Sequence, residues 1–153
     1  LGARAILWHQ GESDLASGTT TEDYTSMLNE VIMGSRIAAG WDIPWVVARA
    51  SYLPGFSSES LAVIVDAQQT VIDNDSLPYL GPDTDNLIGD SWRYDTVHFN
   101  GEGLREHARL WDISISVMME DFLGWDDDGD GVENTQDDCE DTPLCEPTYA
   151  DGC

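Results

Sequence analysis

The sequence contains no lysine, and besides three histidines its only basic residues are six arginines among 153 residues. Thirty aspartate and glutamate residues outweigh them and give a formal net charge of −24 at pH 7. A nucleic-acid-binding surface needs clustered cations to neutralise phosphates, so this balance excludes nucleic acid as an expected partner. The charge is typical of a protein in salty or calcium-containing surroundings, where counterions screen the repulsion.

The sequence also lacks any apolar run long enough to cross a bilayer, which requires about 20 residues. No signal-peptide pattern opens the chain, and its first residue is Leu1 rather than methionine. We therefore expect no membrane span, and we expect a fragment, with any targeting segment lying upstream. The hydrophobic content of 41% is that of a globular protein, and the chain is long enough for one domain with a core.

Cysteine is missing from the first 138 residues, and Cys139, Cys145 and Cys153 all lie in an acidic tail. Residues 126–153 hold eleven acidic residues and no basic one, whereas residues 1–125 hold nineteen acidic residues and all six arginines. This change in composition predicts a domain boundary at Asp126. Cysteines confined to a short tail indicate disulfide bonds and an oxidising compartment, so we expect a secreted or cell-surface protein.

Hydrophobic periodicity predicts an α/β domain over residues 1–125. Continuous apolar runs at 4–8 and 44–50 are typical of buried parallel strands. We expect a polar loop at 13–21 and an irregular segment at 77–90. Apolar residues three and four apart predict helices near 20–40, 58–74 and 100–124, with these buried faces: Tyr24, Met27, Leu28, Val31 and Ile32; Leu61, Ile64, Val65, Gln68, Val71 and Ile72; Leu104, Ala108, Trp111, Ile115, Met118 and Phe122.

Two clear strands are too few for a stable doubly wound sheet. The alternation of strands and helices still indicates a layered architecture, so we expect the N-terminal part of the domain to be missing from this chain.

The chemistry is concentrated in two polar clusters. Gln10, Gly11 and Glu12 follow the first apolar strand, and ligands of parallel sheets bind just beyond the carboxyl ends of strands. The second cluster is Asp95-x-x-His98, whose spacing on a loop allows the carboxylate to hold the imidazole Nδ1 and leave Nε2 free. Acyl transfer to water needs such a base and its orienting group, together with donors for the oxyanion. Gln10 is the candidate donor, and Glu12 is a second carboxylate that could orient His98 or bind substrate hydroxyls.

The two clusters resemble conserved blocks of a known enzyme family. Trp8-His9-Gln10-Gly11-Glu12-Ser13-Asp14 resembles the third block of SGNH (GDSL-like) hydrolases, in the branch of sialate O-acetylesterases and carbohydrate esterase family six. Tyr94-Asp95-Thr96-Val97-His98-Phe99 resembles the final block of that branch. The resemblance implies a three-layer parallel-sheet domain and a serine esterase that removes acetyl groups from sialate- or xylan-type carbohydrates. It makes His98 the base, Asp95 the acid with Glu12 as the competing assignment, and Gln10 an oxyanion donor.

The nucleophilic serine of that family precedes the Gln-Gly-Glu block, and this chain begins too late to contain it. Gly89-Asp90-Ser91 has the residue types expected around the nucleophilic serine. No helix directly follows it, however, so it cannot form a strand-to-helix elbow. We therefore expect the chain alone to be inactive. His9 and His107 are interpreted as structural residues, and Trp92 is the best candidate to contact a sugar ring. A zinc site from His9, His98 and Glu12 lacks helical ligand spacing and is disfavoured.

The tail carries the register of a calcium loop. Gly131 stands at the sixth position, and six oxygen ligands fall at the positions that an EF-hand-type loop uses: Asp126, Asp128, Asp130, the Val132 carbonyl, Asn134 and Asp137. Residues 126–143 resemble a thrombospondin type 3 repeat, which implies an extracellular spacer ordered by structural Ca²⁺. The resemblance also implies a Cys139–Cys153 pair with Cys145 left over. We thus expect a small irregular tail stabilised by calcium and disulfides.

Two other hypotheses compete with the esterase. One is a non-catalytic, calcium-dependent adhesion or surface protein whose α/β part is a degenerate hydrolase. The other is an acidic α/β domain without chemistry. Layered α/β folds host many functions, so only the site residues separate these hypotheses.

Overall fold

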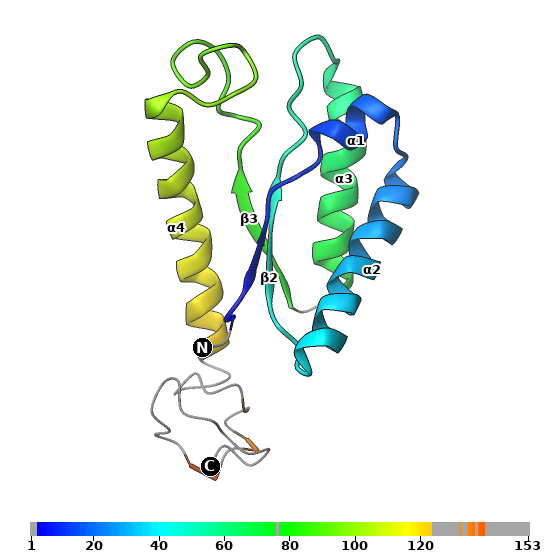
Figure 1. The fold of residues 1–153 in the computed structure, drawn as a ribbon, viewed down its shortest axis with the longest axis vertical. Helices are drawn as coiled ribbons and strands as arrows, with labels where there is room; N and C mark the ends of the chain where they lie inside the picture. The colour runs from blue at the N-terminus through cyan, green and yellow to red at the C-terminus, as the bar shows by residue number, and fades with distance from the viewer. Residues whose placement is uncertain (1–2, 76, 124–131, 133–134, 137, 140–153) are drawn as a thin grey trace.

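The computed structural model describes residues 3–75, 77–123, 132, 135–136 and 138–139. Three parallel strands form its sheet in the order β1-β2-β3 (Figure 1). The strands are β1 (Ile6–Trp8), β2 (Trp45–Arg49) and β3 (Pro78–Asp83). The helices are α1 (Glu12–Ser17), α2 (Thr21–Ala39), α3 (Ser58–Asn74) and α4 (Gly101–Leu123).

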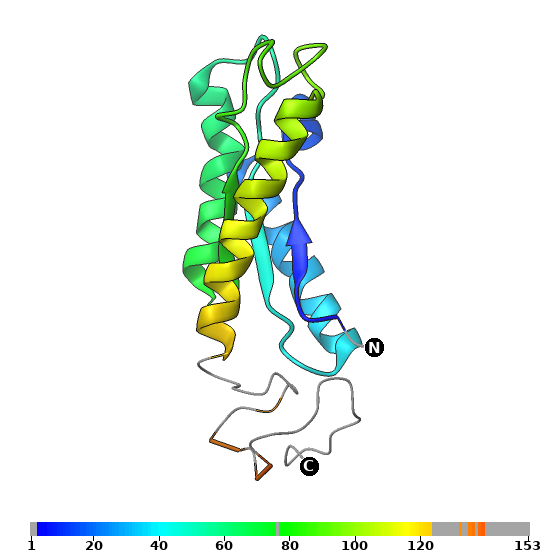
Figure 2. The same cartoon turned by 90° about the vertical axis from the view of Figure 1, so that its left-hand side faces the viewer.

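Helices cover both faces of the sheet, which makes a three-layer α/β arrangement (Figures 1 and 2). α2 and α3 lie on one face, and their core residues Leu28 and Ile64 pack with Val47 of the central strand. α4 lies on the other face, where Trp111 and Met118 pack with Val46. Val46 and Val47 are both 0% exposed because β2 is sandwiched between the helical layers. The predicted α/β fold class with a parallel sheet is confirmed.

The helix boundaries follow local capping chemistry. Thr20 accepts a hydrogen bond from the Asp23 amide at 3.1 Å and caps α2, which ends at Gly40 with φ 81°. Ser57 caps α3 through the Ser60 amide at 3.3 Å. Asn100 accepts from the Gly103 amide at 2.9 Å at the start of α4. The predicted starts of these three helices are therefore confirmed to within a residue or two.

Two segments differ from the sequence prediction. The expected loop at 13–21 contains α1, a short helix with Glu12 and Asp14 in its first turn and Gly18 as a left-handed C-cap. The expected irregular segment at 77–90 contains β3. The sequence did not predict this strand because Pro78 and Pro82 are rare inside strands. In the described sheet β3 pairs on one side only, and such a strand tolerates proline at positions whose N–H would point away from the neighbouring strand.

The predicted buried faces are right along the centre of the helices and wrong at their margins. Tyr24, Leu28 and Ile32 of α2 are at most 3% exposed, whereas Met27 and Val31 are each 47% exposed. Leu104 of α4 is 57% exposed and Ala108 is also exposed, so the prediction that both are buried was wrong. The core of each helix is a narrower stripe of residues, which pack with the central strand. The side chain of Phe122 lies outside the described residues.

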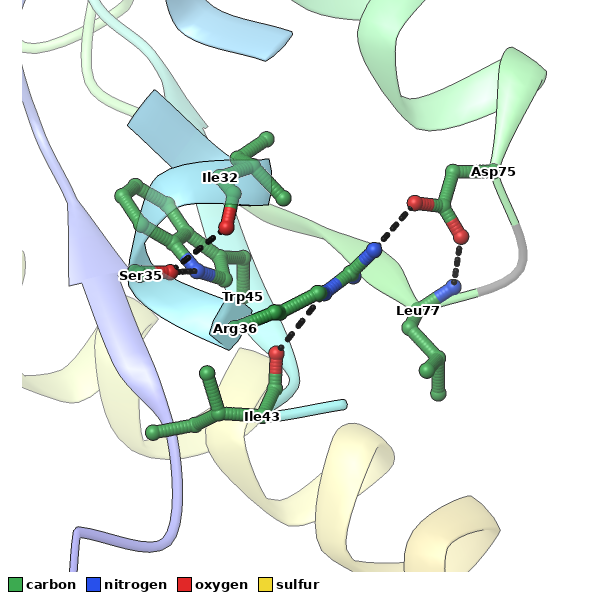
Figure 3. A network of polar contacts seen from close by, with 7 residues as sticks. All are labelled: Ile32, Ser35, Arg36, Ile43, Trp45, Asp75 and Leu77. Atoms are coloured by element: carbon green, nitrogen blue, oxygen red, sulfur yellow. Dashed lines mark hydrogen bonds and ion pairs between the residues drawn. The ribbon is translucent and has the colours of Figure 1, made fainter. Parts of the chain in front are cut away.

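A polar network fastens the amino end of the sheet (Figure 3). Arg36 of α2 pairs with Asp75 at 2.5 Å and donates to the Ile43 carbonyl at 3.4 Å. Asp75 in turn accepts from the Leu77 amide at 3.1 Å. Next to them, Trp45 Nε1 donates to the Ser35 hydroxyl at 3.1 Å. These contacts tie the ends of α2 and α3 to the starts of β2 and β3.

No helix in the described part of the chain combines the length and the apolar character that a membrane span requires. The expected calcium loop, apart from Val132, Thr135 and Gln136, and the expected partner of Cys139 lie outside the described residues.

Candidate active site

The carboxyl ends of the three strands bring three loops to one edge of the sheet. β1 leads into Gln10–Glu12, and β2 leads into Ser51 and Tyr52. β3 leads into Thr84 and Asp85, which begin the long loop to α4 at the same end of the sheet (Figure 1). Asp85 joins two of them, because its carboxylate accepts hydrogen bonds from the Ser51 and Tyr52 amides, each at 2.8 Å. This is the edge at which open parallel sheets bind ligands.

A tight turn at 94–98 holds the expected Asp–His pair. The turn is closed by the Tyr94 amide, which donates to the His98 carbonyl at 3.0 Å. Asp95 Oδ1 accepts from the His98 amide at 2.7 Å and the Val97 amide at 3.0 Å. Thr96 takes φ 70° between them, a strained conformation for a β-branched residue. Backbone hydrogen bonds to Oδ1 thus hold the Asp95 carboxylate in place independently of its contact with the imidazole.

The second oxygen of Asp95 lies 2.7 Å from His98 Nδ1. Hydrogen bonds from the His98 backbone and ring, with the Val97 amide, lower the pKa of Asp95 to about 2. A carboxylate that remains ionised favours a proton on Nδ1, which leaves the lone pair of Nε2 available to accept a proton. The His98 side chain is 67% exposed, so Nε2 is open to a reacting group. The Tyr94 ring stacks on the imidazole with centroids 5.8 Å apart.

Gln10 and Glu12 lie at the neighbouring loop. The Gln10 side chain is turned toward α1 and α2, where its Nε2 donates to the Asp14 carboxylate and its Oε1 accepts from Tyr24 at 3.3 Å. Glu12 is half-buried at the start of α1. Burial chiefly lowers the pKa of Arg93, and the charge of Glu12 is near enough to oppose that shift. Among the described residues it is Asp95, and not Glu12, that hydrogen-bonds His98. The catalytic roles of all four residues stay predictions.

Gly11 explains why the motif at the end of β1 requires glycine. A Cβ atom there would collide with the Ala50 carbonyl and lie 2.7 Å from Ile64 Cγ2. It would also lie 3.0 Å from Gln68 Nε2, which donates to the Gln10 carbonyl at 3.0 Å. The absence of a side chain lets the start of α1 sit against β2 and α3. The position of the Gln-Gly-Glu segment therefore depends on this close approach.

The other two histidines have packing roles. Thr84 donates its hydroxyl proton to the Arg49 carbonyl at 2.9 Å, so it accepts from His9 Nε2, also at 2.9 Å. His107 accepts from Trp111 Nε1 at 3.1 Å, and burial lowers its pKa. The two imidazole rings meet edge to face at 4.9 Å. These contacts agree with the structural interpretation of both residues.

One residue of the site, Arg93, was missed by the sequence analysis. Its side chain is buried beneath the Asp95–His98 turn, and its partners are backbone carbonyls and aromatic rings. A single arginine within a polar loop carries no sequence signal for this arrangement. Trp92 is half-buried, and its carbonyl accepts from the Asn100 amide at 2.8 Å, while a role in sugar binding stays a prediction.

Within the described ranges, no group of three or more histidine, cysteine, aspartate or glutamate side chains could hold a metal ion. Of the six expected calcium ligands only Val132 is described, so the expected site lies outside this part of the chain.

Comparison with protein families gives one match. The family model for carbohydrate esterases of the sialic acid-specific acetylesterase type matches residues 2–111. No curated protein and no solved structure matches the chain. The matched residues include both polar clusters and the whole of the described sheet.

Proposed function

The chain belongs to the sialic acid-specific acetylesterase family of carbohydrate esterases, and we propose that it is the base-bearing part of a serine esterase that removes acetyl groups from carbohydrate hydroxyls. The family supports the esterase class and an acetylated carbohydrate as substrate. The finer assignment depends on the geometry at the carboxyl edge of the sheet.

One observation carries the proposal, namely the 2.7 Å contact between Asp95 Oδ2 and His98 Nδ1. It gives His98 the arrangement that acyl transfer requires, with one ring nitrogen held by an ionised carboxylate and the other exposed. Asp95 is the better candidate than Glu12 for the orienting acid because it makes this contact.

In the proposed reaction, His98 Nε2 takes the proton of a hydroxyl nucleophile as the oxygen attacks the acetyl carbonyl. The tetrahedral oxyanion is stabilised by hydrogen-bond donors, and Gln10 is proposed as one of them. The imidazolium then protonates the sugar oxygen, which leaves as a free hydroxyl. Water, deprotonated by His98, then attacks the acyl-enzyme. The oxygen of the nucleophile leaves and takes the proton back from the imidazolium, and acetate is released. Asp95 holds the imidazole in position and stabilises its charged form.

We propose that the nucleophile is a serine from outside these 153 residues. Ser91 is exposed in a loop, and α4 does not begin until Gly101, so Ser91 lacks the strand-to-helix elbow that presents a nucleophile.

The test measures acetate release from O-acetylated sialic acid and acetylated xylo-oligosaccharides by the protein as its gene encodes it. His98→Ala should lower kcat by about 100- to 10,000-fold, the usual contribution of a general base. Arg109→Gln is the matched control, because Arg109 is exposed on α4 and, among the described residues, pairs with Glu106 alone. The control should keep its activity.

Equal activity of wild type and His98→Ala would contradict the proposal. Absence of hydrolysis in the wild type on every acetylated sugar would favour the alternative of a non-catalytic, calcium-dependent surface protein.

We also propose, from the ligand register of residues 126–137 alone, that the tail binds structural Ca²⁺ and that the protein is secreted or displayed at the cell surface. Isothermal titration with CaCl₂ should show one site that Asp126→Ala weakens, with acetate release unchanged. Absence of heat at millimolar Ca²⁺ would exclude the site.

A further inference from the structure

Arg93 lies at the centre of the carboxyl edge with 5% of its surface exposed, and the proposed reaction gives it no step. Burial of a guanidinium is costly unless its donors are satisfied. The contacts that satisfy the Arg93 guanidinium therefore indicate what this buried charge does at the carboxyl edge.

The guanidinium donates to backbone carbonyls on both sides of the loop that precedes α4. Nε donates to Leu87 at 2.6 Å and Nη2 to Thr84 at 3.4 Å, both in the segment that leaves β3. Nη1 donates to Val97, the residue immediately before His98. One side chain thus links the end of β3 to the backbone that carries the imidazole.

Two aromatic rings fix the plane of the guanidinium. Its central carbon lies 4.3 Å from the centroid of Phe99, which directly follows His98. It lies 4.7 Å from the centroid of Tyr52, in the loop after β2. Cation–π contacts of this kind hold a flat group in one orientation. The stack therefore connects the His98 turn to a second strand of the sheet.

Every hydrogen bond that the guanidinium makes among the described residues goes to a backbone carbonyl. The carboxylate of Asp95 is left for His98. This separation differs from an ordinary buried ion pair, in which the arginine would occupy the acid.

We propose that Arg93 is the positioning residue for the base, holding the 94–98 turn so that His98 Nε2 faces the reacting ester. The inference rests on the proposed function, since it too takes His98 as the base. A lysine cannot replace these contacts, because one ammonium group lacks both the planar fork and the flat face that stacks on the two rings.

The experiment compares Arg93→Lys with Arg36→Lys. Arg36 is a matched control because it is a partly buried arginine, with 14% of its side chain exposed, at the opposite end of the sheet, where it pairs with Asp75 (Figure 3). Phe99→Leu is a milder variant that removes one ring and keeps the hydrogen bonds of the guanidinium. All variants are measured for kcat and KM, for thermal unfolding, and by ¹⁵N NMR of the imidazole at pH 8.5.

We expect Arg93→Lys to lower kcat by about 10- to 100-fold with KM within about twofold, as for a displaced catalytic group. The His98 nitrogen signals should shift toward the Nε2-protonated tautomer. The kcat and tautomer ratio of Phe99→Leu should lie between those of wild type and Arg93→Lys, and Arg36→Lys should change neither.

Equal effects of the Arg93 and Arg36 variants on kcat and tautomer would overturn the proposal, and so would an unchanged tautomer in both Arg93→Lys and Phe99→Leu. Absence of turnover in the wild type would overturn the proposed function instead, while the NMR comparison still decides the role of Arg93.

Discussion

The two ends of the sheet each hold an arginine, and the partners of the two arginines differ. At the amino end, Arg36 pairs with a carboxylate and joins α2 to the end of α3. At the carboxyl end, Arg93 binds backbone carbonyls and leaves Asp95 to bind His98. The first arrangement fixes elements of the scaffold to each other. The second fixes a loop while keeping its acid and base paired with each other and open to solvent.

Under the proposed function, charge at the carboxyl edge serves chemistry, whereas the Arg36–Asp75 pair at the amino end serves stability. Changes to the two ends should therefore separate activity from unfolding, and the following predictions test that separation in order of decreasing effect.

The largest difference should come from Asp95→Asn. The neutral amide accepts the Nδ1–H hydrogen bond more weakly than an ionised carboxylate does, and it does not stabilise the imidazolium. We therefore expect kcat to fall by about 100-fold or more. The thermal midpoint at pH 7 should fall only modestly, because the variant loses the stabilisation of an ionised carboxylate that is 40% exposed and screened by solvent. Steady-state kinetics and calorimetry on the same preparations check both expectations. A variant that loses stability and activity in parallel would contradict the division between the two ends.

The pH dependence of the same pair has a defined sign. The pKa of Asp95 is about 2 in the folded protein and about 4 in an unfolded chain. The folded state therefore gains from ionisation above pH 4, and this gain is lost as the pH falls toward 2. Wild type should lose stability over this range more steeply than Asp95→Asn. Parallel acid-unfolding profiles would show that the contacts of Asp95 are not retained in solution.

Two glycine substitutions give a smaller contrast, now in stability. Gly11→Ala places a methyl group against the Ala50 carbonyl and Ile64, so we expect a loss of about 1–3 kcal/mol in the free energy of unfolding. Gly34→Ala lies at an exposed position of helix α2, where nothing is within 4 Å of the new Cβ. There we expect a gain of about 0.5–1 kcal/mol from lower backbone entropy in the unfolded chain. Urea titration measures both, and equal effects at the two glycines would refute the close packing at Gly11.

The sequence predicted the fold where the signals are local. Thr20, Ser57 and Asn100 mark helix starts through their side-chain oxygens, and the apolar run at 44–50 is long enough to indicate a buried strand. β3 was missed because its prolines and Gly81 are typical of loops. Gly81 is needed there because a Cβ would lie 2.7 Å from the Ala48 backbone nitrogen, a fact that only the sheet reveals.

The residue types of the candidate site were predictable from the sequence, but the long-range contacts that position them were not. The three-residue gap between Asp95 and His98 sufficed to predict their contact, because turn geometry is local. The direction of the Gln10 side chain was not predictable, since its partner Tyr24 comes from another helix. Arg93 left no pattern either, because its partners are carbonyls of its own loop and rings from that loop and the loop after β2.

The central claim is that Asp95 holds His98 with Nε2 free, and ¹⁵N NMR of the His98 imidazole at pH 8.5 tests it most directly. Free histidine favours the proton on Nε2, so a carboxylate at 2.7 Å from Nδ1 should reverse that preference. The account predicts a signal dominated by the Nδ1-protonated form, lost in Asp95→Asn. A wild-type imidazole protonated mainly on Nε2, unchanged by Asp95→Asn, would contradict it.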